Sequence, residues 1–186
     1  MFVMKVVLAG DGSVGKTALR ERYLGRGFKS SYVLTVGADF AVKNAKIGNK
    51  NFQYQIWDLA GQPRFDSVRG VYYRGCAGAL LVFDITRPDS FENLQKWVDE
   101  VWRNNGRGMV PIIILGNKSD LQEQFPEHIT VEQIEKYTDK LSRETLVRGF
   151  AISYMPTSAK IGLNVDQSFE LLGSTCLQRE SSAIQR

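Results

Sequence analysis

A glycine-rich run near the N-terminus has the residue types that hold phosphate groups. It reads Gly10-Asp11-Gly12-Ser13-Val14-Gly15-Lys16-Thr17 and fits the pattern Gly-x-x-x-x-Gly-Lys-Ser/Thr. Its glycines allow a tight turn in which successive backbone N–H groups point at one anion. Lys16 adds a charge for the β- and γ-phosphates, and the Thr17 hydroxyl is a ligand for Mg²⁺. The run therefore predicts a phosphate-binding loop, hereafter the phosphate loop, against the simpler interpretation of a glycine-rich turn.

A second run, Asn117-Lys118-Ser119-Asp120, has the chemistry to recognise a purine base. Guanine presents N1–H and the N2 amino group as adjacent donors, and one carboxylate accepts both, so we expect Asp120 to read guanine. Adenine has no such donor pair and would leave the carboxylate unpaired, a mismatch that can reject the wrong base by about 10⁴-fold. We expect Asn117 to tie this loop to the phosphate loop, and Lys118 to lay its stem along the base or sugar.

Two weaker features extend the expected nucleotide site. The run Thr157-Ser158-Ala159-Lys160 follows a predicted strand, and its Ala159 N–H can donate to guanine O6. Phe28 lies in a polar connector, where stacking on the base and packing in the core are equal alternatives. The residues that these runs lead us to expect around GTP are Gly12, Ser13, Val14, Gly15, Lys16, Thr17, Ala18, Phe28, Gly61, Asn117, Lys118, Asp120, Ser158, Ala159 and Lys160.

The run Asp58-Leu59-Ala60-Gly61-Gln62 ends a predicted strand. An aspartate at that place can hold Mg²⁺ through water beside Thr17. Gly61 lets the backbone approach the γ-phosphate, and Gln62 has an acceptor and a donor with which to orient a water molecule. The alternatives are a strand-end cap for Asp58 and an ordinary surface residue for Gln62, and both weaken once the phosphate loop is accepted.

Apolar strand patterns and helical patterns alternate along the chain. A strand at 3–9 and a helix at 18–23 flank the phosphate loop, and the runs 39–47 and 51–58 flank Gly48-Asn49, which predicts an antiparallel hairpin. Further strands are predicted at 78–84, 110–115 and 150–154, and further helices at 91–102, after the capping box Thr130-Val131-Glu132-Gln133, and from Asn164. The alternation predicts an α/β fold with a mostly parallel sheet and helices on both faces, which binds its ligand at the carboxyl ends of the strands.

Length and composition fit one intracellular domain. The chain has 186 residues, of which 43% are hydrophobic, and no stretch is apolar enough to span a bilayer. Two distant cysteines predict reduced thiols and neither a disulfide framework nor a zinc site. The net charge is +4, with basic residues scattered along the chain, so nucleic acid is not an expected partner.

With these residues in place, the chain resembles the Ras-superfamily small GTPases from Lys5 to about Leu177, and most resembles their Rab group. The stretches that carry the Rab resemblance are Val36-Gly37-Ala38-Asp39-Phe40, Gln55-Ile56-Trp57-Asp58, Tyr72-Tyr73-Arg74-Gly75 and Leu81-Val82-Phe83-Asp84-Ile85-Thr86. The resemblance implies a single three-layer P-loop GTPase domain over residues 1–178, with a six-stranded sheet that has one antiparallel strand, and a short tail at 179–186.

The resemblance also implies roles for particular residues. Thr35 lies in a first switch and, when GTP is present, binds its γ-phosphate and the Mg²⁺ ion. The other Mg²⁺ ligands are Thr17 and, through water, Asp58. A second switch covers about 60–73. Residues Gln62, Lys16, Gly61 and Thr35 take part in GTP hydrolysis. Phe40, Trp57 and Tyr72 form an exposed aromatic patch that faces effectors, with half-buried sheet packing as the alternative. Hydrolysis is expected to be slow without an activating protein, because no arginine lies in the segment just before Thr35.

The sequence departs from that family in two places. Pro63 stands where relatives usually have glutamate, so the ordinary mechanism of nucleotide exchange is in doubt. The chain ends Ser182-Ala183-Ile184-Gln185-Arg186, without a prenylated cysteine motif or a polybasic tail, so this C-terminus does not support membrane contact. We expect a cytoplasmic monomer that meets effector, exchange-factor and GTPase-activating proteins, and that reaches membranes only peripherally, through partners.

Three functions compete at this point. The first is a Mg²⁺-dependent GTPase switch, Rab-like and acting in membrane traffic. The second is a GTP-binding interaction module with negligible hydrolysis, which Gln62 and Gly12 oppose and Pro63 leaves open. The third is an adenine-specific ATPase or kinase, which Asp120 opposes.

Overall fold

The computed structural model describes residues 2–28 and 34–184, the last four of these by their backbone alone. Its single sheet has the strand order β2-β3-β1-β4-β5-β6, and only β2 runs antiparallel to its neighbour. The expected α/β fold with a six-stranded, mostly parallel sheet is thereby confirmed. The strands are β1 (Phe2–Ala9), β2 (Ala38–Ile47), β3 (Lys50–Leu59), β4 (Gly78–Asp84), β5 (Ile112–Asn117) and β6 (Ser153–Pro156).

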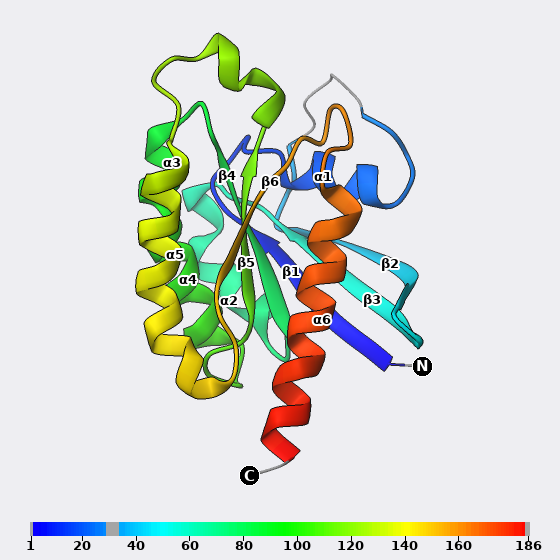
Figure 1. Cartoon of the computed structure of the whole chain (residues 1–186). Helices are drawn as coiled ribbons and strands as arrows, with labels where there is room; N and C mark the ends of the chain where they lie inside the picture. Colours follow the sequence, from blue (N-terminus) through cyan, green and yellow to red (C-terminus); the bar gives the residue numbers. More distant parts are fainter. Residues whose placement is uncertain (1, 29–33, 185–186) are drawn as a thin grey trace.

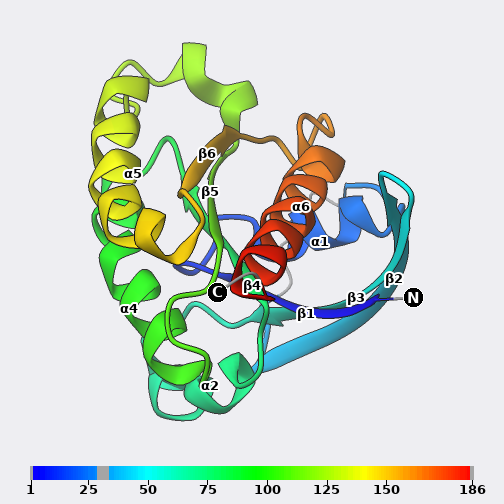
Figure 2. The same cartoon turned by 60° about the horizontal axis from the view of Figure 1, so that its bottom comes forward.

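Helices cover both faces of the sheet (Figures 1 and 2). On one face lie α1 (Lys16–Tyr23) and α6 (Val165–Ile184), and on the other lie α2 (Asp66–Tyr73), α4 (Leu94–Asn104) and α5 (Val131–Thr145). The shorter helical segments are η1 (Pro63–Phe65), α3 (Pro88–Glu92), η2 (Ser119–Gln124) and η3 (Leu146–Arg148). None of the helices in the described ranges is long and apolar enough to cross a bilayer.

Two apolar clusters hold the layers together, one on each face. Every residue of β4 and β5 is buried, as expected for central parallel strands that are covered on both sides. On the α1–α6 face the rings of Tyr23 and Phe169 stack in parallel. On the other face Trp97 of α4 and Tyr73 of α2 are buried in the same cluster. The two clusters hold the helices against the sheet, and the loops at its carboxyl edge are therefore attached to a rigid support.

The helix predicted at 91–102 is two helices, so that prediction was wrong in its continuity. Pro88 begins α3 three residues earlier than expected, and α4 begins at Leu94. Asn93 stands between them, and its side-chain Nδ2 donates to Asp11 Oδ2 at 2.7 Å. The spacing of apolar residues predicts only which face of α4 is buried. It does not indicate a polar partner that is distant in sequence.

Two strands lie further along the chain than the sequence pattern indicated. Pro111 has no N–H to give to a ladder, and β5 begins at Ile112 and runs to Asn117. β6 begins at Ser153, because the Ile152 N–H donates to the Ser142 hydroxyl of α5 and is not available to β5. The hairpin around Gly48 and the capping box at Thr130 are confirmed. At the C-terminus α6 continues to Ile184, past residue 178.

Candidate functional site

The phosphate loop joins β1 to α1 and has a backbone that depends on its glycines. Gly10 and Gly15 have backbone φ values of 140° and 101°, which residues other than glycine rarely adopt. A Cβ on Gly10 would lie 2.1 Å from the Val82 carbonyl oxygen, and a Cβ on Gly15 would lie 2.2 Å from Asn117 Nδ2. Ser13 has φ 65° without being glycine. The loop is thus packed against the ends of β4 and β5 at two points where only glycine fits.

Lys16, the first residue of α1, folds back over the phosphate loop. Its Nζ donates to the carbonyl oxygens of Gly10 and Asp11, each at 2.7 Å. Burial lowers the pKa of Lys16 to about 8, although the negative charges of Asp58 and Asp11 act in the opposite direction. The ammonium group is therefore held at the mouth of the loop at a cost in solvation that an anion would offset.

Three oxygen-bearing side chains meet beside Lys16. The Thr17 hydroxyl donates to Asp58 Oδ2 at 2.5 Å and lies 2.9 Å from the Thr35 hydroxyl. Burial raises the pKa of Asp58, and the hydrogen bond from Thr17 opposes that rise. Asp58 Oδ1 is buried and has no hydrogen-bond partner among the described residues. The nearest guanidinium is that of Arg20, whose Nη1 lies 3.9 Å from Asp58 Oδ2.

Gly61 and Gln62 lie directly against the phosphate loop. A Cβ on Gly61 would lie 2.4 Å from the Gly10 carbonyl oxygen and 2.5 Å from the Gly12 nitrogen, so no other residue fits there. The Gln62 Nε2 lies 3.7 Å from the position of a Cβ on Gly12, and the Gln62 Oε1 is buried without a partner among the described residues. A cavity of about 520 Å³ opens between these residues, lined by Asp11, Gly12, Ser13, Leu34, Gly61, Gln62, Pro63, Arg87, Asn93, Lys96 and Trp97.

Asn117, at the end of β5, joins three loops. Its Nδ2 donates to the Val14 carbonyl of the phosphate loop at 2.8 Å. Its Oδ1 accepts from the Ala159 N–H at 3.2 Å and from the Thr157 hydroxyl at 3.4 Å. The expected tie between the two loops is therefore present. The Ala159 N–H, which we expected to face guanine O6, donates to Asn117 Oδ1 in this structure.

Asp120 is held in place by the neighbouring loop. Its Oδ1 accepts from the buried Ser158 hydroxyl at 2.5 Å, and its Oδ2 lies 4.0 Å from Lys160 Nζ. Lys118 has φ 64°, and its Nζ lies 2.6 Å from Asp84 Oδ2. The expected base-contacting residues thus converge at the carboxyl ends of β5 and β6.

Phe28 and the aromatic patch lie at the surface around this edge. Phe28 is 43% exposed and belongs to neither core cluster, so packing in the core is not its role. Phe40 is 47% exposed, and its ring lies 5.0 Å from that of Trp57, which in turn lies 5.6 Å from that of Tyr72. Phe40 is the most exposed of the three, and Trp57 and Tyr72 are half-buried. The three rings nevertheless form one continuous surface across β2, β3 and α2.

Sequence reasoning missed the side chains that support this site from the two ends of α3 and from α4. Both carboxylate oxygens of Asp11 are occupied, by Asn93 Nδ2 at 2.7 Å and by the Trp97 indole Nε1 at 2.8 Å. Arg87 Nη1 donates to the Gly12 carbonyl at 2.9 Å. The sequence carried one usable signal, a tryptophan and an asparagine one helical turn apart, but periodicity assigned that helix to core packing alone.

Fully buried Arg69 of α2 is a second missed feature. It makes two hydrogen bonds to Glu100 of α4, at 2.8 and 3.0 Å, and one of 3.0 Å to the Ala60 carbonyl. Tyr73 also donates to Glu100, at 2.8 Å. These contacts anchor the segment that follows Gln62 to α4.

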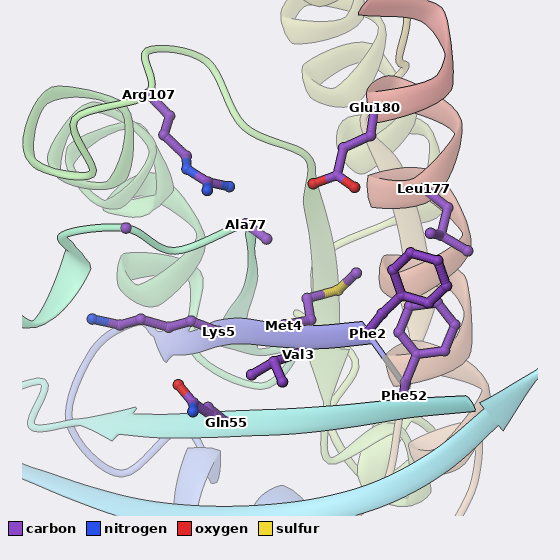
Figure 3. A pocket seen from close by; sticks show the side chains of 11 residues that line it. Phe2, Val3, Met4, Lys5, Phe52, Gln55, Ala77, Arg107, Leu177 and Glu180 are labelled. Atoms are coloured by element: carbon purple, nitrogen blue, oxygen red, sulfur yellow. The ribbon is translucent and has the colours of Figure 1, made fainter. Parts of the chain in front are cut away.

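A second hollow lies at the other end of the sheet (Figure 3). It has a volume of about 180 Å³ and lies between the start of β1, β3 and the C-terminal part of α6. Phe2 and Phe52 stack at one side, with 5.4 Å between their ring centroids, and Arg107 and Glu180 lie across from them. None of the residues expected to bind nucleotide lines this hollow, so it is separate from the site.

Comparison with known proteins agrees with this geometry. The model of the Ras family matches residues 5–178. The chain is 38% identical to Ras-related protein Rab-13 of Mesocricetus auratus over 94% of its length and 80% of that protein. It is 35% identical to Ras-related protein Rab7 of Drosophila melanogaster and 37% identical to the Ypt/Rab-type GTPase YPT7 of Saccharomyces cerevisiae, over 97% of its length and 84% of each relative. The chain therefore belongs to the Ras family, and it is a Rab-like small GTPase.

Proposed function

We propose that one guanine nucleotide spans the site, with its phosphates on the phosphate loop and its base beside Asp120. The observation that carries this proposal is the position of Asn117, which bonds Val14 on one side and Ala159 on the other. A single amide thus fixes the distance between the loop with phosphate-binding chemistry and the loops with base-reading chemistry. A nucleotide is the ligand class that carries both a phosphate chain for the phosphate loop and a base for the base-reading loops.

The residues around Asp58 fit a Mg²⁺ ion. A hard cation prefers oxygen ligands, and the hydroxyls of Thr17 and Thr35 lie beside a buried carboxylate that has one unpartnered oxygen. We assign direct ligation to Thr17 and Thr35 and a water-mediated contact to Asp58. When bound, the ion neutralises charge on the β- and γ-phosphates.

Hydrolysis depends on groups of the phosphate loop and of the cavity beside it. Lys16 holds its positive charge where the β- and γ-phosphates lie, and Gly61 brings its backbone N–H to the γ-phosphate. The buried Gln62 Oε1 is an acceptor without a partner among the described residues, and it orients the attacking water. The sequence just before Thr35 is Tyr32-Val33-Leu34, without arginine. In this proposal an activating protein supplies the missing charge and accelerates the reaction by about 10³–10⁵-fold.

The switch follows from the same bonds. Thr35 and Gly61 hold the ordered loops as long as the γ-phosphate is present, and both are released when it leaves. Phe40 and Trp57 lie on the strands that join the two switches, and Tyr72, whose ring contacts that of Trp57, lies in the second switch. We assign this patch to effector binding. The protein acts as a monomer in the cytoplasm, in membrane traffic, and contacts membranes through its partners.

Binding and turnover of purified protein test the proposal. Protein freed of nucleotide is expected to bind GDP and GTP at submicromolar concentration with Mg²⁺, and excess ATP is not expected to compete. Chelation of Mg²⁺ is expected to speed nucleotide release. Single-turnover hydrolysis over hours separates a GTPase from a module that only binds GTP. Absence of guanine-nucleotide binding at micromolar concentration with Mg²⁺ contradicts the whole assignment.

A further inference from the structure

Arg87, in the loop between β4 and α3, contacts the phosphate loop across the cavity. Its Nη1 donates to the Gly12 carbonyl at 2.9 Å, and its Nη2 lies 2.8 Å from Asp89 Oδ2. The hydrogen bond with Asp89 raises the pKa of Arg87, so the guanidinium stays charged. The segment before Thr35 lacks an arginine, but the fold brings this one to the loop from a distant part of the chain.

The hydrogen bond from Arg87 is made to the peptide group between Gly12 and Ser13, and Ser13 has an unusual backbone conformation. The carbonyl of Gly12 and the N–H of Ser13 belong to the same peptide, and no cis peptide occurs in the described residues. In a trans peptide these two groups point in opposite directions, so a donor on the carbonyl fixes the direction of the N–H. Ser13 has φ 65°, a left-handed conformation that is uncommon and costs energy in residues other than glycine.

The cavity beside this peptide carries positive charge, which would stabilise negative charge that develops on a bound phosphate. Arg87 and Lys96 line the same cavity as Gln62. The nearest carboxylate on that wall, Asp11, has both oxygens occupied by hydrogen bonds from Asn93 and Trp97. Arg87 therefore acts on the loop through its direct hydrogen bond to the Gly12 carbonyl, while its other terminal nitrogen is ion-paired with Asp89.

We propose that Arg87 is a positioning residue for GTP hydrolysis that acts through the Gly12–Ser13 peptide. A charge-assisted bond to the carbonyl polarises the peptide, which makes its N–H a stronger donor and holds it in one direction. In the reaction a water oxygen bonds to the γ-phosphorus while the bond to the bridging oxygen breaks. The electron pair leaves with GDP, and the proton of the water passes to the phosphate. Donors of the phosphate loop stabilise the negative charge that develops.

This inference rests on the proposed role of the phosphate loop, and three variants test it. Arg87→Ala is expected to slow single-turnover hydrolysis about tenfold, because it removes the polarisation of one donor and leaves the donor itself. The affinity for GDP is expected to stay within about threefold, and the affinity for GDP with fluoroaluminate, which mimics the transferring phosphate, is expected to fall about as much as the rate. Arg87→Lys keeps a charged donor and is expected to restore part of the rate. Arg103→Ala removes an exposed arginine from α4 and is the matched control.

Each result bears on the proposal. Wild-type rates and fluoroaluminate affinity in Arg87→Ala overturn it. A parallel loss of GDP affinity and melting temperature, with unchanged hydrolysis of bound GTP, also overturns it and leaves Arg87 as a structural link between loops. If wild-type protein itself neither binds nor hydrolyses GTP, the proposed function fails first, and the inference falls with it.

Discussion

The indole Nε1 of Trp97 donates a hydrogen bond of 2.8 Å to Oδ1 of Asp11 and so joins the buried face of α4 to the phosphate loop. The same tryptophan is almost fully buried in the core. The other oxygen of Asp11 accepts from Asn93, at the break between α3 and α4. The conformation of the loop is therefore set by the helix layer beside it as well as by its own glycines.

Replacing Trp97 with phenylalanine is expected to weaken nucleotide binding and stability together. Phe keeps much of the packing but leaves Asp11 Oδ1 without its partner, which costs about 1–3 kcal/mol. Trp102→Phe is a matched control, because its Nε1 donates to the Val110 carbonyl at 3.0 Å, away from the phosphate loop. Denaturant unfolding and GDP titration of both variants check this. Equal GDP affinities in the two variants contradict the link.

Arg69→Ala is expected to destabilise the protein by about 3–5 kcal/mol, because it leaves the carboxylate of Glu100 without its main partner in a largely buried place. Arg64 lies five residues earlier and is exposed, so Arg64→Ala is expected to change stability by less than about 0.5 kcal/mol. Chemical unfolding of each variant gives the difference. An Arg69→Ala variant as stable as wild type shows that α2 is not held by this contact.

Gln62→Leu is expected to leave GTP affinity unchanged and to slow single-turnover hydrolysis by about tenfold or more, because leucine cannot orient water. The exposed Gln124 offers a control of the same chemistry, and Gln124→Leu is expected to hydrolyse GTP at the wild-type rate. Rapid mixing of GTP-loaded protein with Mg²⁺ measures both rates. Unchanged hydrolysis in Gln62→Leu rejects the water-positioning role.

Asp120→Ala is expected to lower GDP affinity by about 100-fold or more, since it removes the acceptor for both guanine donors. Ser158→Ala keeps that carboxylate but removes the hydroxyl that holds it, so a smaller loss is expected. Asp99 lies on α4 with one amide partner, and Asp99→Ala serves as control. Competition by GDP and ADP against a labelled guanine nucleotide ranks the variants. A Ser158→Ala loss as large as that of Asp120→Ala contradicts the assigned order.

The free energy of unfolding at acidic pH is expected to depend on the ionisation of Asp66. Burial alone would raise the pKa of Asp66, but hydrogen bonds from Lys96 and Arg69 outweigh it and lower the pKa below its ordinary value of 3.8. A carboxylate with a lowered pKa contributes stability that is fully present above its unfolded-state pKa and is lost as the pH falls through the folded value.

The difference in unfolding free energy between wild type and Asp66→Asn is therefore expected to be constant above about pH 5 and to shrink below about pH 4. Urea unfolding at several pH values measures it. A difference that stays constant down to about pH 3 shows that the ion pairs with Lys96 and Arg69 do not act through this titration.

The local sequence pattern was sufficient to predict the sheet and to identify the runs that carry the chemistry. The alternation of apolar segments with helical patterns predicts the parallel sheet, and Gly48-Asn49 predicts the single antiparallel pair, because both depend on residues close in sequence. Element ends were less predictable. The start of β6 depends on a bond from Ile152 to Ser142, and the break before α4 coincides with a bond from Asn93 to Asp11. No local pattern encodes partners that are 10 and 82 residues away.

By itself the sequence determined the class of ligand, because Gly10 to Thr17 and Asn117 to Asp120 carry their chemistry in their residue types and spacing. Only the tertiary structure decided which groups surround that ligand. Trp97 and Arg87 reach the phosphate loop from helices and loops that the sheet places next to it, and the Ala159 N–H turns to Asn117. The physical reason is that hydrogen bonds act over about 3 Å in space, whatever the separation along the chain.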